Sequence, residues 1–310
     1  MSIDIIKGFT ITTLISAAAI YMPLIGLPFA IFIPLPALYY RKKLGRKSGA
    51  LIPVMAIIVI LAVSDGISID IFFVIELLLI GFVLSELLEL RLTVEKTVLY
   101  VCCIVFFSVI ACLLFYSNIS GTTILPMVSD YVSKNLALSI TMYEDMGVPE
   151  KNIHIISNAM EKIEYVLIRI LPAIVIVSTL FITWTSLLLV KPVFKAGDLV
   201  APDFGHLNHW KAPDYLVWVV IVCGLMLILP EKTIKIAGLN GLLVMMIIYF
   251  FEGIAIVSFY FEKKKFPRLL KIILYILIAL QQIALLIVIG LGFFDVWFNF
   301  RKHEKNNDKT

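Results

Sequence analysis

The sequence predicts an all-α protein, a polytopic transmembrane helical bundle with eight or nine crossings. Of its 310 residues, 61% are hydrophobic and only 15% are charged, whereas soluble domains carry about 25% charged residues. The mean hydropathy is +1.02. Long uncharged stretches also recur along the whole chain, and about 20 apolar residues in a helix are enough to cross the hydrocarbon core of a bilayer.

Nine apolar segments, bounded by charged residues and by Pro or Gly, are the candidates for these crossings. They are residues 9–22, 24–40, 51–64, 69–90, 97–116, 165–190, 215–229, 239–261 and 269–298. The last segment is long enough for one tilted crossing, for a crossing followed by an interfacial helix, or for a short hairpin broken near Gln281 and Gln282. We expect residues 1–310 to form a single integral membrane domain.

The orientation follows from where Lys and Arg collect, because short basic loops stay in the cytoplasm. With the basic segment 41–47 placed inside, alternation puts most loop cations on the inner side and predicts a cytoplasmic N-terminus. The basic residues after the last segment disagree with a ninth crossing and favour the hairpin, whereas the length of that segment favours one helix.

Two polar segments stand outside this pattern. Residues 117–164 contain two amphipathic stretches around the turn Met146–Pro149, which predicts an extracytoplasmic helical hairpin that caps the bundle or lies on the membrane. Residues 191–214 form a predicted cytoplasmic loop. The first two crossings are short and contain Pro23, Pro28, Pro34 and Pro36, so they predict broken helices that either line a cavity or simply pack with a kink.

Ionisable side chains inside the crossings are the best pointers to function, because burying them in a membrane is costly. Glu76, Arg169 and Glu252 are such residues, and Tyr249 shares the helix face of Glu252. We interpret these four residues as candidates for a polar ligand site, with Glu76 and Arg169 as a pair. The alternative interpretation is a structural ion pair together with a protonated or hydrogen-bonded glutamate.

Catalytic and metal-binding patterns are missing from the sequence. It contains no HExxH, GxSxG, Walker A or GxGxxG motif, and all four histidines fall outside the predicted crossings. We therefore expect neither an enzyme nor a resident metal or cofactor. The basic residues sit in short clusters between apolar segments, where they act as orientation signals, so we expect no nucleic-acid partner.

Several blocks resemble one known family. They include Trp210-Lys-Ala-Pro, Glu252-Gly-Ile-Ala-Ile-Val-Ser-Phe-Tyr-Phe and the ending Gly290-Leu-Gly-Phe-Phe-Asp-Val-Trp-Phe-Asn-Phe-Arg301. Together they resemble the YybS family of bacterial membrane proteins, a domain of unknown function (DUF2232). The resemblance implies the inner (cytoplasmic) membrane of a bacterium. The N-terminal region of that family is in turn similar to S-components of energy-coupling-factor transporters, six-helix proteins that bind vitamins and join a coupling subunit.

Two functions follow as hypotheses. The first is binding or transport of a small, vitamin-like molecule by an S-component-like bundle with extra C-terminal helices, with a coupling subunit as partner. The alternative is a non-catalytic membrane scaffold that binds envelope proteins during cell-envelope assembly or division. Broken helices, the outer hairpin and the few intramembrane charges favour the first hypothesis, and the lack of motifs fits both.

Overall fold

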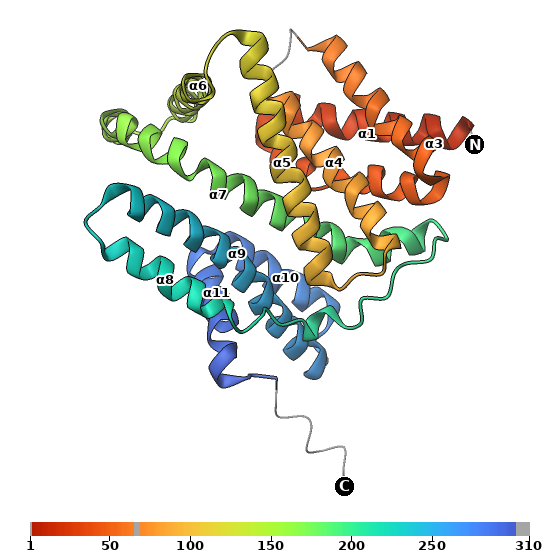
Figure 1. Cartoon of the computed structure of the whole chain (residues 1–310). Helices are drawn as coiled ribbons and strands as arrows, with labels where there is room; N and C mark the ends of the chain where they lie inside the picture. The colour runs from red at the N-terminus through yellow and green to blue at the C-terminus, as the bar shows by residue number, and fades with distance from the viewer. Residues whose placement is uncertain (1, 65–68, 302–310) are drawn as a thin grey trace. The chain divides into compact units, whose positions relative to one another are not determined.

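The computed structural model describes residues 2–64 and 69–301, and these residues form helices joined by turns and loops, with no strand among them (Figure 1). This confirms the predicted all-α class. The helices are α1 (Ser2–Tyr21), α2 (Pro23–Ala30), α3 (Pro34–Val63), α4 (Ile69–Glu89), α5 (Val94–Ser120), α6 (Ile124–Asp145), α7 (Glu150–Ala196), the 3-10 turn η1 (Leu207–His209), α8 (Leu216–Ile228), α9 (Lys232–Lys263), α10 (Arg268–Leu280) and α11 (Gln282–Phe298).

By length and apolar composition, six helical stretches in the described residues are able to cross a membrane. The bent pair α10 and α11 makes seven if it is counted as one span, and α8 is a shorter apolar helix. Seven of the nine predicted segments each lie almost wholly within one helix. The segment 24–40 runs from α2 through the turn 31–33 into α3, and the segment 269–298 covers α10 and α11. Gly45, at φ +80°, kinks α3 between the second and third predicted segments. The protein is therefore a multi-pass membrane protein, and the count of eight or nine crossings stays a prediction.

The helices group into two compact units, which are described separately. Unit 1 comprises Met1–Leu171 and Ser178–Asp203, and unit 2 comprises Pro172–Val177 and Phe204–Thr310. Helix α7 contributes residues to both. The prediction of a single integral membrane domain stays a prediction.

In unit 1, α3 packs between α1 and α4. Arg41 is only 4% exposed and forms ion pairs with Glu86 at 2.7 Å and Glu89 at 2.5 Å, which tie α3 to the end of α4. In the sequence, Arg41 was interpreted only as an orientation signal. Its burial shows that one cation of the basic segment 41–47 also has a structural partner, because a buried charge is retained where it is paired.

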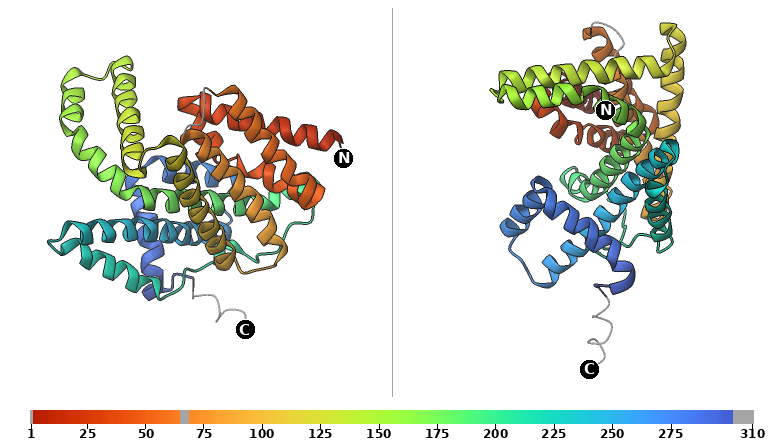
Figure 2. Two further views of the ribbon diagram at one scale, coloured as in Figure 1. Left: turned by 45° about the horizontal axis from the view of Figure 1, so that its top comes forward. Right: turned by 90° about the vertical axis from the view of Figure 1, so that its left-hand side faces the viewer.

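The predicted hairpin at residues 117–164 is present as α6 and the first turns of α7, which run side by side in Figure 2. Ser129 donates to Glu164 at 2.6 Å across the hairpin, and Tyr131 donates to Asp70 of α4 at 2.7 Å. Burial, and then the bond to Asp70, raises the pKa of the Tyr131 hydroxyl. Helix α7 continues for 47 residues, so the segment 165–190 and the second hairpin helix belong to one helix rather than to two.

In unit 2, α9 and α11 approach each other through two glycines. A side chain on Gly253 would collide with the backbone of Val288, and one on Gly292 would collide with the backbone of Tyr249 and Gly253. Only glycine allows two helix backbones to come this close in a membrane. The contact brings the middle of α9 against α11 and so positions the residues described below.

At the end of unit 2, the chain returns to the end of α9. Helix α10 begins shortly after α9 ends at Lys263, and α10 and α11 are bent by 100° at Gln281. The Tyr260 hydroxyl near the end of α9 donates to the carbonyl of Phe300 at 2.8 Å. Phe300, which follows α11, therefore lies beside the end of α9 at which α10 begins. The three interpretations of the segment 269–298 stay predictions.

Candidate functional site

Two of the sequence-predicted site residues lie together on α9 of unit 2. Glu252 is 0% exposed and Tyr249, one helical turn earlier, is 2% exposed. The Tyr249 hydroxyl and both carboxylate oxygens of Glu252 have no hydrogen-bond partner with good geometry among the described residues. A buried polar atom without a partner costs about 1 to 3 kcal/mol, and more when it is charged. The backbone of Ala212 and the side chain of Arg301 also lie against Glu252, so its carboxylate is near donor groups without a hydrogen bond of good geometry.

The end of α11 brings a second carboxylate to this place. Asn299 adopts a left-handed conformation at φ 44° and ends the helix, and its amide donates to the carbonyl of Asp295. The amide of Phe300 donates to Asp295 Oδ1 at 2.7 Å. Asp295 is 2% exposed, and its carboxylate holds the turn that follows α11. The turn that it holds sends the next residue, Arg301, back toward α9.

Arg301 joins these elements into one charge cluster, which we define as Glu252, Asp295 and Arg301. Its Nη2 lies 2.8 Å from Asp295 Oδ2 and 3.6 Å from Glu252 Oε1. Its Nη1 donates to the carbonyl oxygens of Trp210 at 2.7 Å and Asn208 at 3.2 Å. The loop before α8, the middle of α9 and the end of α11 thus meet at a single guanidinium.

The cluster contains two carboxyl groups and one guanidinium, so it carries one net negative charge when both carboxyl groups are ionised. The nearby cation Lys211 already pairs with Asp214 at 2.8 Å. Around Tyr249 the surroundings are apolar and include Ala212, Val217 and Phe293. In such surroundings an electrostatic interaction is stronger than in water. A positive charge or a strong hydrogen-bond donor would complete the cluster.

Glu76 and Arg169 are both in unit 1, and the structure does not pair them. The Glu76 carboxylate is buried and accepts a hydrogen bond from Thr179 of α7 at 2.9 Å. Arg169 is exposed, donates to the carbonyl of Tyr165 and lies 3.4 Å from the centre of the Tyr165 ring. The predicted pair was therefore wrong, because equal depth along two helices does not place two side chains on facing sides.

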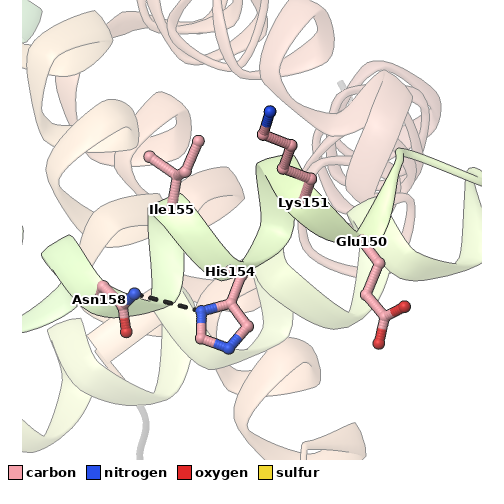
Figure 3. Close-up of a pocket in the computed structure, with 5 residues that line it drawn as sticks. All are labelled: Glu150, Lys151, His154, Ile155 and Asn158. Atoms are coloured by element: carbon pink, nitrogen blue, oxygen red, sulfur yellow. Dashed lines mark hydrogen bonds between the residues drawn. The ribbon is translucent and has the colours of Figure 1, made fainter.

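A shallow pocket of about 420 Å³ lies on the first turns of α7 (Figure 3). Its lining residues are Glu150, Lys151, His154, Ile155 and Asn158, with Asn158 and His154 3.1 Å apart. All of them come from one helix, and in Figure 3 Lys151 and Ile155 point to a different side from Glu150. No second element closes this pocket, so we do not treat it as the functional site.

Asp295 and Arg301 were not among the predicted site residues. Asp295 lies within the apolar run 269–298, so the criterion that selected Glu252, an ionisable residue inside a crossing, would also have selected Asp295. Arg301 follows the run and was counted as an orientation charge. Only the turn at Asn299 reveals that it comes back to α9. Among the described residues, no group of three or more His, Cys, Asp or Glu is arranged to hold a metal ion.

The comparisons with known proteins agree with this description. The family described as "Predicted membrane protein (DUF2232)" matches residues 10–296. "Uncharacterized protein YybS" of Bacillus subtilis (strain 168) is 23% identical over 309 residues, which cover 97% of this chain and 96% of that protein. No solved structure matches. Three of the blocks that carried the resemblance, around Trp210, Glu252 and Arg301, meet at the charge cluster. The chain belongs to the DUF2232 family of predicted membrane proteins.

Proposed function

We propose that this membrane protein binds a small polar solute within the membrane, at Tyr249 and Glu252 in unit 2. The observation that carries the proposal is the buried Tyr249 hydroxyl and Glu252 carboxylate, neither of which has a hydrogen bond of good geometry among the described residues, although Arg301 lies 3.6 Å from Glu252. Small-molecule sites typically combine apolar walls with a few polar groups that fix orientation. Tyr249 and Glu252, set among apolar side chains of α8, α9 and α11, have this composition.

The chemistry of the site favours a positively charged solute. The carboxylate and hydroxyl oxygens are acceptors for the N–H groups of a protonated amine and are also ligands for a monovalent metal ion. Either solute would neutralise the excess negative charge that Glu252 and Asp295 leave beside Arg301. An anion would face two carboxylates, so we expect the site to exclude it.

We propose binding, and transport by extension, rather than catalysis. The charge cluster offers carboxylates, a guanidinium and a phenol, and none of these is an activated nucleophile held by a base. The location that fits this role is the inner membrane of a bacterium with the N-terminus in the cytoplasm, where the positive-inside pattern places it. A coupling subunit or an envelope protein remains our proposed class of protein partner.

The test is thermal unfolding of the purified full chain in detergent. The probes are alkali-metal chlorides, small primary amines, neutral sugars and inorganic phosphate. A solute present at about 100 times its dissociation constant stabilises the folded state by about 2.7 kcal/mol. We therefore expect at least one cationic probe to raise the unfolding midpoint by several degrees, and we expect Glu252→Gln to abolish the shift.

Glu231→Gln is the matched control, because Glu231 is an exposed carboxylate at the start of the same helix. It should keep the full ligand-induced shift. A shift that survives Glu252→Gln would place the ligand elsewhere and refute the proposed site. If no probe shifts the midpoint, the solute-binding proposal fails, and crosslinking to envelope proteins becomes the decisive test of the scaffold alternative.

A further inference from the structure

Unit 1 carries a groove that the proposed solute site does not use. It has a volume of about 450 Å³ and is lined by side chains of α1, α3 and the end of α7. The lining includes Ile11, Ile15, Leu35, Tyr39, Ala196 and Gly197. Nearly all of this surface is apolar, and the ring of Tyr39 lies directly against Gly197.

The groove has one charged end, which follows from helix periodicity. On α1, Lys7, Ile11 and Ile15 are spaced by four residues and share one helix face. On α3, Leu35, Tyr39 and Lys43 have the same spacing. In each helix the two apolar residues line the groove and the lysine stands at the same end, beyond them. The groove is thus apolar along its length, and it has a cationic end at Lys7 and Lys43, which we call the mouth.

One of the two lysines at the mouth has no ion-pair partner in the described part of the chain. Lys43 pairs with Asp4 at 2.8 Å and is 34% exposed, so its ammonium group can donate a further hydrogen bond to a phosphate oxygen. Lys7 is exposed and forms no ion pair in the described part of the chain. Lys195 lies between two lining residues of α7, Val193 and Ala196. This end belongs to the side that the positive-inside pattern assigns to the cytoplasm, where anionic lipids are concentrated.

We propose that the groove binds an acyl chain of an anionic phospholipid, whose phosphate group contacts Lys7 and Lys43. An apolar channel that ends in ammonium groups matches a molecule with a hydrocarbon tail and an anionic headgroup. A soluble anion would contact only the lysines at the mouth, and a neutral lipid would contact only the apolar lining of the groove. The lipid is a site-specific ligand of unit 1 and is independent of the solute at Glu252.

The experiment compares the full chain in nanodiscs of pure phosphatidylcholine with nanodiscs that contain an equal mixture of phosphatidylcholine and phosphatidylglycerol. The readouts are the unfolding midpoint and the phosphatidylglycerol retained after detergent extraction, counted by native mass spectrometry. We expect phosphatidylglycerol to raise the midpoint and to be retained. Lys7→Glu should lower its apparent affinity about fivefold or more, the effect of one lysine near an anionic lipid surface.

Lys47→Glu is the matched control, because Lys47 is an exposed lysine that follows the non-helical Gly45 and so does not continue the helix face of Leu35, Tyr39 and Lys43. It should leave retention unchanged. Ala196→Trp keeps the cations but fills the channel, and it should also release the lipid. The proposal is overturned if Lys7→Glu and Lys47→Glu act equally, if phosphatidylcholine is retained as well as phosphatidylglycerol, or if inorganic phosphate alone stabilises the protein to the same extent.

Discussion

Replacing Arg301 by Met is expected to destabilise unit 2 by about 3 to 5 kcal/mol, the cost of removing one partner from a buried ion pair. Asp295 and Glu252 are 2% and 0% exposed, so neither carboxylate has access to water when the guanidinium is removed. The carbonyl oxygens of Trp210 and Asn208 also lose their donor. The measurement is the unfolding midpoint of the purified chain in detergent.

Two further variants distinguish the destabilisation caused by the loss of Arg301 from the effect of removing any cation. Arg268→Met removes an exposed arginine at the start of α10 and should change the midpoint little. The triple variant Glu252→Gln, Asp295→Asn, Arg301→Met removes all charges together and should recover most of the stability, since a neutralised cluster no longer buries an unpaired charge. A triple variant as unstable as Arg301→Met would contradict the assignment of the charge cluster.

Gly292→Ala is expected to destabilise the protein by about 1 to 3 kcal/mol, the usual cost of overpacking a well-packed core. The new methyl group would meet backbone atoms of Tyr249 and Gly253 in α9, and backbone cannot move aside as a flexible side chain can. Because Tyr249 and Glu252 depend on the same helix contact, the variant should also weaken solute binding. Unfolding midpoints and the cation-induced shift measure the two effects.

The control lies two residues away on the same helix. Gly290 has open space around it, and alanine is favoured over glycine inside a helix by about 1 kcal/mol. Gly290→Ala is therefore expected to be neutral or stabilising, opposite in sign to Gly292→Ala. Equal effects of the two substitutions would show that helix propensity, and not the contact between α9 and α11, governs this part of unit 2.

Much of the fold was predictable because membrane helices are recognised by their apolar composition. Seven of the nine predicted segments lie almost wholly within one helix, the other two span a break between helices, and the turn near Met146 separates α6 from α7 as expected. The kink of α3 at Gly45 separates the segments 24–40 and 51–64. These features depend on local hydropathy, on glycine and on proline, all of which are visible in a short window of sequence.

The partners of the buried charges were not predictable in the same way. Glu76 bonds to Thr179, 103 residues away, and an uncharged hydroxyl in an apolar run gives no signal that it faces a carboxylate. Asp295 and Arg301 meet because Asn299 ends α11 in a left-handed turn. Two side chains face each other only if both helices have the right rotation and the chain continues in the right direction beyond the helix end. The hydropathy pattern gives no information on helix rotation or on the path of the chain.

The hydrogen bond from Tyr260 to Phe300 also has a consequence for the side of the membrane on which each terminus lies. A segment that leaves and rejoins the same end of α9 does not carry the chain across the bilayer. If eight crossings precede this segment, as the sequence predicts, Arg301 and the N-terminus face the same compartment. Reporter domains fused at either terminus should then be active on the same side of the membrane, and activity on opposite sides would show that the last segment crosses the bilayer.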